Sequence, residues 1–429
     1  MGSTLFQKGG PNIIRQNSHA PLPYQLRDHD GGSIVRLDRP LPQVPPFTPK
    51  TPPMTTPLEY TYVERADQLP GLLAWLETAA EIAVDSEADS MHSYFEKVCL
   101  LQLTAGTRNY LVDPLAGLDL APLLDILARK PLILHGADYD LRMLRIDYGF
   151  RPGQPPFETM LAAQLIGSSR LGLTALVEGC CGVRLEKQEQ RSDWARRPLS
   201  PAQLDYAAAD THYLPAVAAW CRGELARLGR TAWHDESCAA LVAATATDRP
   251  VDEENAWRLK GFAGLPLREL AFARELWQWR DALAREADRP PFMIMNESGL
   301  VALAQHLSRD LNLHDFRLPR HIVGARLEQL HQAAQRAAAL PAAQYPAPPA
   351  RQSVVRDLEV EARVGKLRHA VTRLATELGI EPPVIASRSR LEAIAKQLPR
   401  DRQALMAAGP LLGWQADLLL PAVLELAPA

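Results

Sequence analysis

Short apolar runs and helical periodicities are interspersed over residues 57–225, which is the pattern of an α/β domain. The predicted helices include residues 68–78 and 121–128. The predicted strands lie at 60–63, 82–85, 98–104, 109–112 and 132–134. Strands between residues 82 and 112 follow one another with little helix between them, so we expect antiparallel pairing there. The later elements alternate in the α/β manner, so the whole predicts a mixed sheet flanked by helices.

The remainder of the chain is predicted to be helical. Apolar residues recur at helical spacing in residues 267–287, and a bundle of about 80 residues is expected around them. Trp277 and Trp279 belong to this series, and tryptophans at helical spacing predict core packing; base stacking is the alternative. Residues 358–426 are again predicted to be helical, which indicates a second, more diverged bundle.

Proline-rich stretches suggest where the domains end. Residues 1–56 are rich in proline and poor in core-forming residues, so we expect a disordered or polyproline-like extension. A second proline-rich stretch at 341–355 predicts an extended linker. The predicted domains are therefore an α/β unit at 57–230, a linker and helical domain at 231–340, and a second helical domain at 356–429.

Four acidic residues in three separate stretches are the candidate chemistry. Asp85 and Glu87 sit two apart on a predicted strand, so their side chains share one face. Asp140 follows the strand at 132–134 near a strand-to-helix turn, where α/β folds place functional groups. Asp210 lies on a helix predicted at 205–220, preceded by a Ser-Pro cap, and Tyr206 lies four residues earlier on the same face. Acids that converge repel one another unless divalent cations lie among them, and paired cations hydrolyse phosphodiesters.

Each of these residues has a structural alternative. Asp85 alone would be a loop or cap residue, and Tyr206 alone would be a core aromatic residue; their joint occurrence with the other acids favours the functional interpretation. Asp138 competes with Asp140 but is placed to cap the following helix. His135 is a candidate general base, but the resemblance described next favours a structural role for it, because that resemblance gives the orienting role to Tyr206.

The acid-bearing stretches resemble the exonuclease motifs of the ribonuclease D branch of the DEDD superfamily, in its tyrosine-containing form. They read Val-Asp-Ser-Glu at 84–87, His-Gly-Ala-Asp-Tyr-Asp at 135–140, and Tyr-Ala-Ala-Ala-Asp at 206–210. The resemblance implies a ribonuclease H-like fold. It also implies that the four acids hold two Mg²⁺ or Mn²⁺ ions, with Asp85, Glu87 and Asp210 at the first ion and Asp140 at the second, bridged by Asp85. Tyr206 would orient the attacking water. Glu158 stands where relatives commonly have aspartate.

The helical segments resemble HRDC domains, the small module shared by RecQ-type helicases and ribonuclease D. The expected activity is therefore 3′–5′ removal of nucleoside 5′-monophosphates from RNA, such as tRNA precursors. Residues 57–225 hold 15 Lys/Arg and 23 Asp/Glu, whereas residues 256–340 hold 12 and 9, so a mildly basic unit that could contact phosphates adjoins an acidic one. A DNA-directed exonuclease and an inactive nucleic-acid-binding scaffold are the alternatives.

Bulk composition agrees with an enzyme of the cytoplasm. No run approaches ~18 apolar residues, so neither membrane insertion nor a membrane partner is expected. The five cysteines lack the paired spacing of a zinc site and are predicted to be buried thiols, with a redox pair at Cys180 and Cys181 as the alternative.

Overall fold

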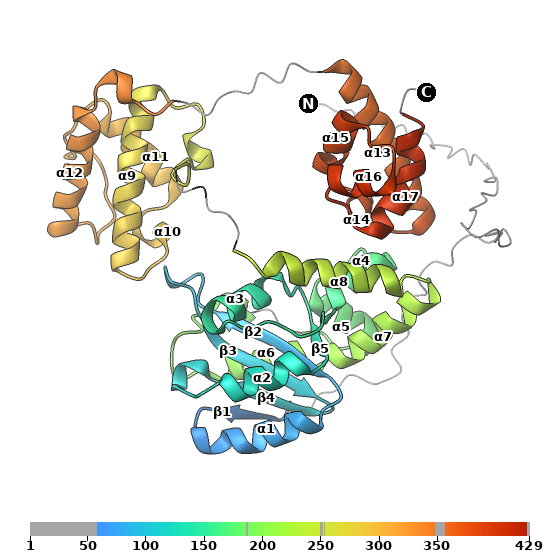
Figure 1. Cartoon of the computed structure of the whole chain (residues 1–429). Coiled ribbons are helices and arrows are strands. Elements are labelled where there is room, and N and C mark those ends of the chain that lie inside the picture. The colour runs from blue at the N-terminus through green and yellow to red at the C-terminus, as the bar shows by residue number, and fades with distance from the viewer. Residues whose placement is uncertain (1–57, 186–187, 249–251, 253, 348–356, 427–429) are drawn as a thin grey trace, which may run out of the picture. The chain divides into compact units, whose positions relative to one another are not determined.

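The computed structural model describes residues 58–185, 188–248, 252, 254–347 and 357–426 of the 429-residue chain (Figure 1). The predicted proline-rich extension at 1–56 lies outside the described residues. So do residues 348–355 of the predicted linker. The prediction for these segments, and the domain boundaries drawn from it, stay predictions.

A six-stranded mixed sheet lies at the centre of the first part of the chain, in the order β1-β4-β3-β2-β5-β6. β2 pairs antiparallel with β3, and β3 with β4, as predicted; the other pairs are parallel. The strands are β1 Tyr60–Val63, β2 Ile82–Ala88, β3 Val98–Ala105, β4 Arg108–Val112, β5 Leu132–Leu134 and β6 Phe157–Glu158.

Helices cover both faces of this sheet (Figure 1). Every residue of β3 is buried, which is why it reads as an almost continuous apolar run and not as an alternating one. Leu101 and Leu103 of β3 belong to a core shared with α1, α2 and α3. Leu100, on the opposite face, packs with Ala207 and Ala208 of α6. The helices of this part are α1 Leu69–Thr78, α2 Ala121–Arg129, α3 Asp138–Tyr148, α4 Thr159–Ile166, α5 Leu173–Cys181, α6 Pro201–His212, α7 Leu214–Arg227 and α8 Thr231–Thr245, with 3-10 turns at Ala66–Gln68, Pro114–Ala116 and Gln188–Arg191.

The helix predicted at 205–220 is two helices, so that prediction is wrong in its continuity. α6 ends at His212, and α7 begins at Leu214 with Pro215 in its first turn. Proline has no backbone N–H, and its ring collides with the carbonyl four residues earlier, here that of Thr211. The chain therefore restarts at Tyr213. The predicted Ser-Pro cap is confirmed, because Ser200 accepts a hydrogen bond from the Gln203 N–H and completes a capping box, and the helix begins at Pro201.

α8 begins where the predicted domain boundary was drawn, yet it packs on the α/β domain. The Arg142 and Arg145 guanidinium groups of α3 donate to backbone carbonyls at Ala244 and Thr245 near the end of α8. His234 of α8 lies with its Nε2 2.9 Å from the Glu158 carbonyl. α8 therefore packs as part of the α/β domain.

The first helical bundle has its own apolar core, which contains Trp279 and is packed by Trp277. The prediction that these tryptophans are core residues is confirmed for Trp279, whereas Trp277 is partly buried at the edge of that core. Asn296 caps α11 by accepting from the Gly299 N–H at 2.8 Å. The elements here are a 3-10 turn at Lys260–Phe262, α9 Leu267–Glu286, α10 Pro291–Ile294, α11 Glu297–Leu307, α12 Ala325–Ala339 and a 3-10 turn at Ala342–Gln344.

The second helical bundle repeats part of this pattern. In both bundles a long helix is followed by a four-residue helix that starts at proline and then by a side-chain-capped helix, with Ser387 in the place of Asn296. Its helices are α13 Leu358–Leu378, α14 Pro382–Ile385, α15 Arg388–Gln397, α16 Arg402–Ala408 and α17 Gly413–Leu424. Among the described residues no single helix is long and apolar enough to cross a membrane. One sharply bent pair of helices, α16 and α17, has sufficient combined length and apolar composition, and these two properties are the only evidence for a span.

The five cysteines are all free thiols. Cys99, Cys221 and Cys238 are buried as predicted, and Cys180 and Cys181 are half-buried at the end of α5. Burial raises the pKa of Cys180 to about 12, with a smaller effect from the neighbouring thiol. A thiol held in its protonated form is a poor nucleophile, which favours the interpretation of Cys180 as an unreactive thiol.

Candidate metal centre and active site

β2 supplies two of the predicted acids from one face. Asp85 and Glu87 alternate with Val84 and Ser86 along the strand, so the carboxylates project to one side and the Ser86 hydroxyl to the other. In the antiparallel ladder with β3, Asp85 lies opposite Gln102 and Glu87 opposite Leu100. The register shifts immediately after Glu87, and Ala88, the last residue of β2, pairs with Val98 beyond this irregularity. Both acids therefore stand near the end of the strand.

α6 brings the third acid to the same face. Asp210 is buried, and the Tyr206 hydroxyl one turn earlier donates a hydrogen bond to its carboxylate. The next residue, Thr211, fixes the helix on the sheet, because its hydroxyl lies 2.8 Å from that of Thr104 in β3. The capped start at Ser200 and this contact together set the height of Asp210 above β2.

Three of the four predicted acids converge tightly. Asp85, Glu87 and Asp210 each place a carboxylate oxygen within 4.8 Å of the others. Among the described residues, no other group of three or more His, Cys, Asp or Glu side chains brings its ligand atoms this close together. Asp140 stands beside this group without belonging to it. Its Oδ1 accepts a hydrogen bond from the Ser86 hydroxyl at 2.5 Å, from the opposite face of β2.

Burial and mutual repulsion dominate the electrostatics. The pKa of Asp85 is raised well above its ordinary value, first by burial and then by the charges of Asp140, Asp210 and Glu87. The pKa of Glu87 is raised by burial and then by Asp210 and Asp140. Burial likewise raises the pKa of Asp210 and of Asp140, against opposing hydrogen bonds from Tyr206 and Ser86. So many acids cannot all ionise in one place without a countercharge.

This donor set fits a hard divalent cation. The converging ligands are carboxylate oxygens, the donors that Mg²⁺ and Mn²⁺ prefer, and the cluster contains no thiolate or imidazole that would favour zinc. The raised pKa values of the acids also indicate a cation site, because a cation among the acids would restore their ionised forms.

Tyr206 is held as a neutral donor. Burial raises the pKa of its phenol first, and the nearby charges of Asp210, Glu87 and Asp85 raise it further. The hydroxyl therefore keeps its proton at neutral pH. Its place beside Asp210 allows it to orient a polar ligand at the acidic cluster.

Two competing residues have structural roles. The prediction that Asp138 caps α3 is wrong. The cap position is Ala137, which has no capping side chain. Asp138 instead forms an ion pair with Arg142, one turn further along the helix, at 3.2 Å. His135 Nδ1 lies 2.9 Å from the Thr159 hydroxyl, and burial lowers the pKa of its imidazole to about 4. His135 is therefore neutral at physiological pH, consistent with the structural interpretation.

Glu158 has a structural role that its sequence context did not indicate. Its carboxylate caps α4 by accepting from the Met160 and Leu161 N–H groups, at 3.1 and 2.6 Å. It also accepts from the Gly136 N–H, at 2.5 Å. Gly136 has a φ of +72°, a conformation that suits glycine, in the turn that leads into α3. Glu158 thus holds the turn that delivers Asp140.

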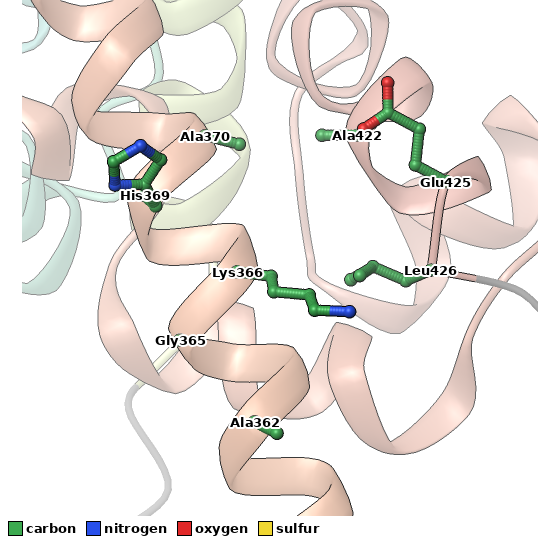
Figure 2. A pocket seen from close by; sticks show the side chains of 8 residues that line it. All are labelled: Ala362, Gly365, Lys366, His369, Ala370, Ala422, Glu425 and Leu426. Atoms are coloured by element: carbon green, nitrogen blue, oxygen red, sulfur yellow. The ribbon is translucent and has the colours of Figure 1, made fainter.

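The second bundle contains a surface groove with a different character. It has a volume of about 510 Å³ and lies between α13 and the end of α17. In Figure 2, Lys366 of α13 extends toward Leu426, and Glu425 is the one carboxylate in the lining. A single acid opposite a lysine does not form a cation site, so the chemistry of the described residues concentrates at β2, α3 and α6.

Comparison with known proteins agrees with this geometry. The family model described as 3′-5′ exonuclease matches residues 60–220, which include all four acids and Tyr206. A ribonuclease D from Jannaschia sp. is 32% identical over 344 residues, covering 78% of this chain and 88% of that protein. The chain belongs to the ribonuclease D family.

Two further proteins are similar to this chain. The crystal structure of Escherichia coli RNase D, described as an exoribonuclease involved in structured RNA processing, superposes with a TM-score of 0.63 at 26% identity, covering 86% of this chain and 98% of that one. The exosome complex exonuclease RRP6 of Saccharomyces cerevisiae is 30% identical, covering 68% of this chain and 42% of that protein.

The HRDC family model matches residues 269–312 and 360–426, so both helical bundles are HRDC domains. The predicted fold, a ribonuclease H-like mixed sheet followed by HRDC units, is confirmed. The enzyme class is confirmed as well: this is a 3′–5′ exonuclease of the ribonuclease D type.

Proposed function

We propose that this protein removes nucleotides one at a time from RNA 3′ ends, by hydrolysis at a centre of two divalent cations. The convergence of Asp85, Glu87 and Asp210 within 4.8 Å, with the charge of Asp140 beside them, carries the proposal. When bound, a pair of Mg²⁺ or Mn²⁺ ions activates a water and stabilises the departing 3′ oxygen.

The residues divide into ligands and an orienting group. Asp85, Glu87 and Asp210 would hold the first ion, and Asp140, with Asp85 shared, the second. The Ser86 hydroxyl occupies one lone pair of Asp140 Oδ1 and so restricts how that carboxylate rotates. The Tyr206 hydroxyl would orient the attacking water, a role for which its retained proton suits it. The expected products are nucleoside 5′-monophosphates.

RNA with a structured body, such as a tRNA precursor with a 3′ extension, is the substrate that we infer. The support is the RNA substrate of the E. coli relative and the presence of two HRDC domains in this chain. The first of these lies in the segment with excess positive charge, which suits contact with phosphates.

The direct test is exonuclease activity on 3′-labelled RNA with Mg²⁺ or Mn²⁺. Wild-type protein should release labelled mononucleotides, and Asp85→Asn and Asp140→Asn should lose at least about 100-fold in rate, because each removes a charged ligand. Asp138→Asn is the matched control: it lies two residues from Asp140 in α3, is paired with Arg142, and should retain near wild-type activity.

Equal activity of wild type and Asp85→Asn would remove the proposal. Loss of activity in Asp138→Asn as large as in Asp140→Asn would show that α3 had been disturbed as a whole. Faster degradation of a matched DNA strand than of RNA would keep the chemistry but overturn the substrate.

A further inference from the structure

Gln102 is a buried polar residue that the fold alone does not explain. It lies in the middle of β3 with no exposed surface, and among the described residues neither its Oε1 nor its Nε2 has a hydrogen-bond partner. Buried polar groups are paired in the great majority of cases, because an unpaired one loses its hydration without compensation. Thr104, two residues on and on the same face, shows the usual situation, since its hydroxyl bonds with Asn109 and Thr211.

The strand register places Gln102 directly at the acidic cluster. It pairs with Asp85 in the antiparallel ladder. Side chains of directly opposed residues lie on the same face with Cβ atoms about 4.5–5.5 Å apart. A glutamine spans that gap easily, so the carboxamide can reach the Asp85 carboxylate by rotation about its side-chain bonds.

The same face of β3 lies beneath α6. Leu100, the next residue toward the strand start on this face, packs against Ala207 and Ala208, and Thr104 on the other side contacts Thr211. Gln102 is therefore enclosed between the strand that carries Asp85 and the helix that carries Asp210. Bulk water is excluded from this space, so a donor here acts in a low-dielectric environment.

A carboxylate that holds a cation through one oxygen needs a donor for the other. Such donors orient the ligand and tune its affinity, and their loss typically weakens metal binding or activity 10- to 100-fold. A carboxamide suits the position because it carries N–H donors without adding charge to a crowded acidic site.

We propose that Gln102 is a positioning residue of the metal centre: its Nε2–H donates to the outer oxygen of Asp85 and aims the other oxygen at the cation. The inference rests on the proposed metal-dependent function. It assigns no chemical step to Gln102, which acts through Asp85.

The test is Gln102→Met in the full-length protein, which keeps the length and flexibility of the side chain and removes both polar atoms. Leu103→Met is the matched control, because Leu103 is equally buried in β3 but faces the other side of the sheet. Mn²⁺ alone is titrated by calorimetry, and stability without metal is measured by hydrogen exchange of peptides from β2 and β3 in EDTA.

A positioning role and a structural role predict opposite results. We expect Gln102→Met to be at least as stable as wild type without metal, since it removes an unpaired buried amide, and to bind Mn²⁺ at least about 10-fold more weakly. Leu103→Met should bind Mn²⁺ as wild type does. Wild-type affinity for Mn²⁺ in Gln102→Met, or a metal-free variant that is less stable or does not fold, would overturn the inference. A wild-type protein that binds no Mn²⁺ would overturn the proposed function and the inference with it.

Discussion

Removing one acid from the cluster should stabilise the metal-free protein, and the effect should depend on pH. Burial raises the pKa of Asp210 from 3.8 to about 7, with a further contribution from Asp140. A carboxyl group with a raised pKa in the folded state binds more protons folded than unfolded between these values. Its contribution to stability therefore falls as the pH rises from about 4 to about 7. Asp210→Asn keeps an oxygen acceptor for Tyr206 but has no charge, so this loss should disappear.

The magnitude follows from the pKa difference. Each tenfold change in an acid constant is worth about 1.4 kcal/mol, so 3.8 to about 7 corresponds to roughly 4 kcal/mol for an isolated group. Sharing of protons among the four acids lowers this figure. We expect the two proteins to be about equally stable near pH 4, and Asp210→Asn to be more stable by about 2–4 kcal/mol at pH 7.

The assay is hydrogen exchange of peptides from β2 and α6 in EDTA, because a chain with three cores need not unfold in one step. Comparing the two proteins at each pH cancels contributions from histidines and thiols. Adding Mn²⁺ to about 1,000 times its dissociation constant should reverse the order, since it stabilises the wild type by about 4.1 kcal/mol. An Asp210→Asn protein no more stable than wild type at pH 7 without metal would refute the reasoning.

Three further substitutions separate the roles of neighbouring residues. Tyr206→Phe should lower kcat by about 100-fold or more while leaving Mn²⁺ affinity within a few-fold of wild type, because it removes an orienting hydroxyl and no ligand; equal loss in both would contradict that role. Ser86→Ala should weaken Mn²⁺ binding or activity by about 10-fold, since Asp140 loses its 2.5 Å hydrogen bond, and calorimetry together with nuclease assays decides it. Glu158→Ala should destabilise the α/β domain by about 1–2 kcal/mol, measured by hydrogen exchange of α4 peptides, because it uncaps α4 and releases the Gly136 N–H; unchanged protection would exclude the capping role.

The strands and the paired acids could be predicted because local patterns determine them. Every strand except the two-residue β6 is predicted from its local sequence pattern, and a spacing of two residues on β2 is enough to put Asp85 and Glu87 on one face. A spacing of four on α6 likewise sets Tyr206 beside Asp210. These relations need no knowledge of which elements pack together.

What the sequence left open depends on contacts between distant elements. The Ser86 hydroxyl matters only because α3 brings Asp140 to the opposite face of β2, 54 residues along the chain. The alternation along β2 does indicate that Ser86 faces away from Asp85, but not what it meets. Gln102 looked like one polar residue in an apolar strand, and only the register shows that Asp85 is opposite.

Two local predictions failed for local reasons. The helix break at Tyr213 was signalled by Pro215, whose effect on the preceding turn outweighs the helical tendency of the alanines around it. Asp138 was expected to cap α3, but the helix begins one residue earlier than that role requires, and the ion pair with Arg142 takes the carboxylate instead.

The most direct test of the central claim is the position of bound metal. Anomalous diffraction from crystals of the full-length protein soaked in Mn²⁺ should show one peak coordinated by Asp85, Glu87 and Asp210, and a second between Asp85 and Asp140. Peaks elsewhere, or a well-ordered acidic cluster with no peak at saturating Mn²⁺, would contradict the account.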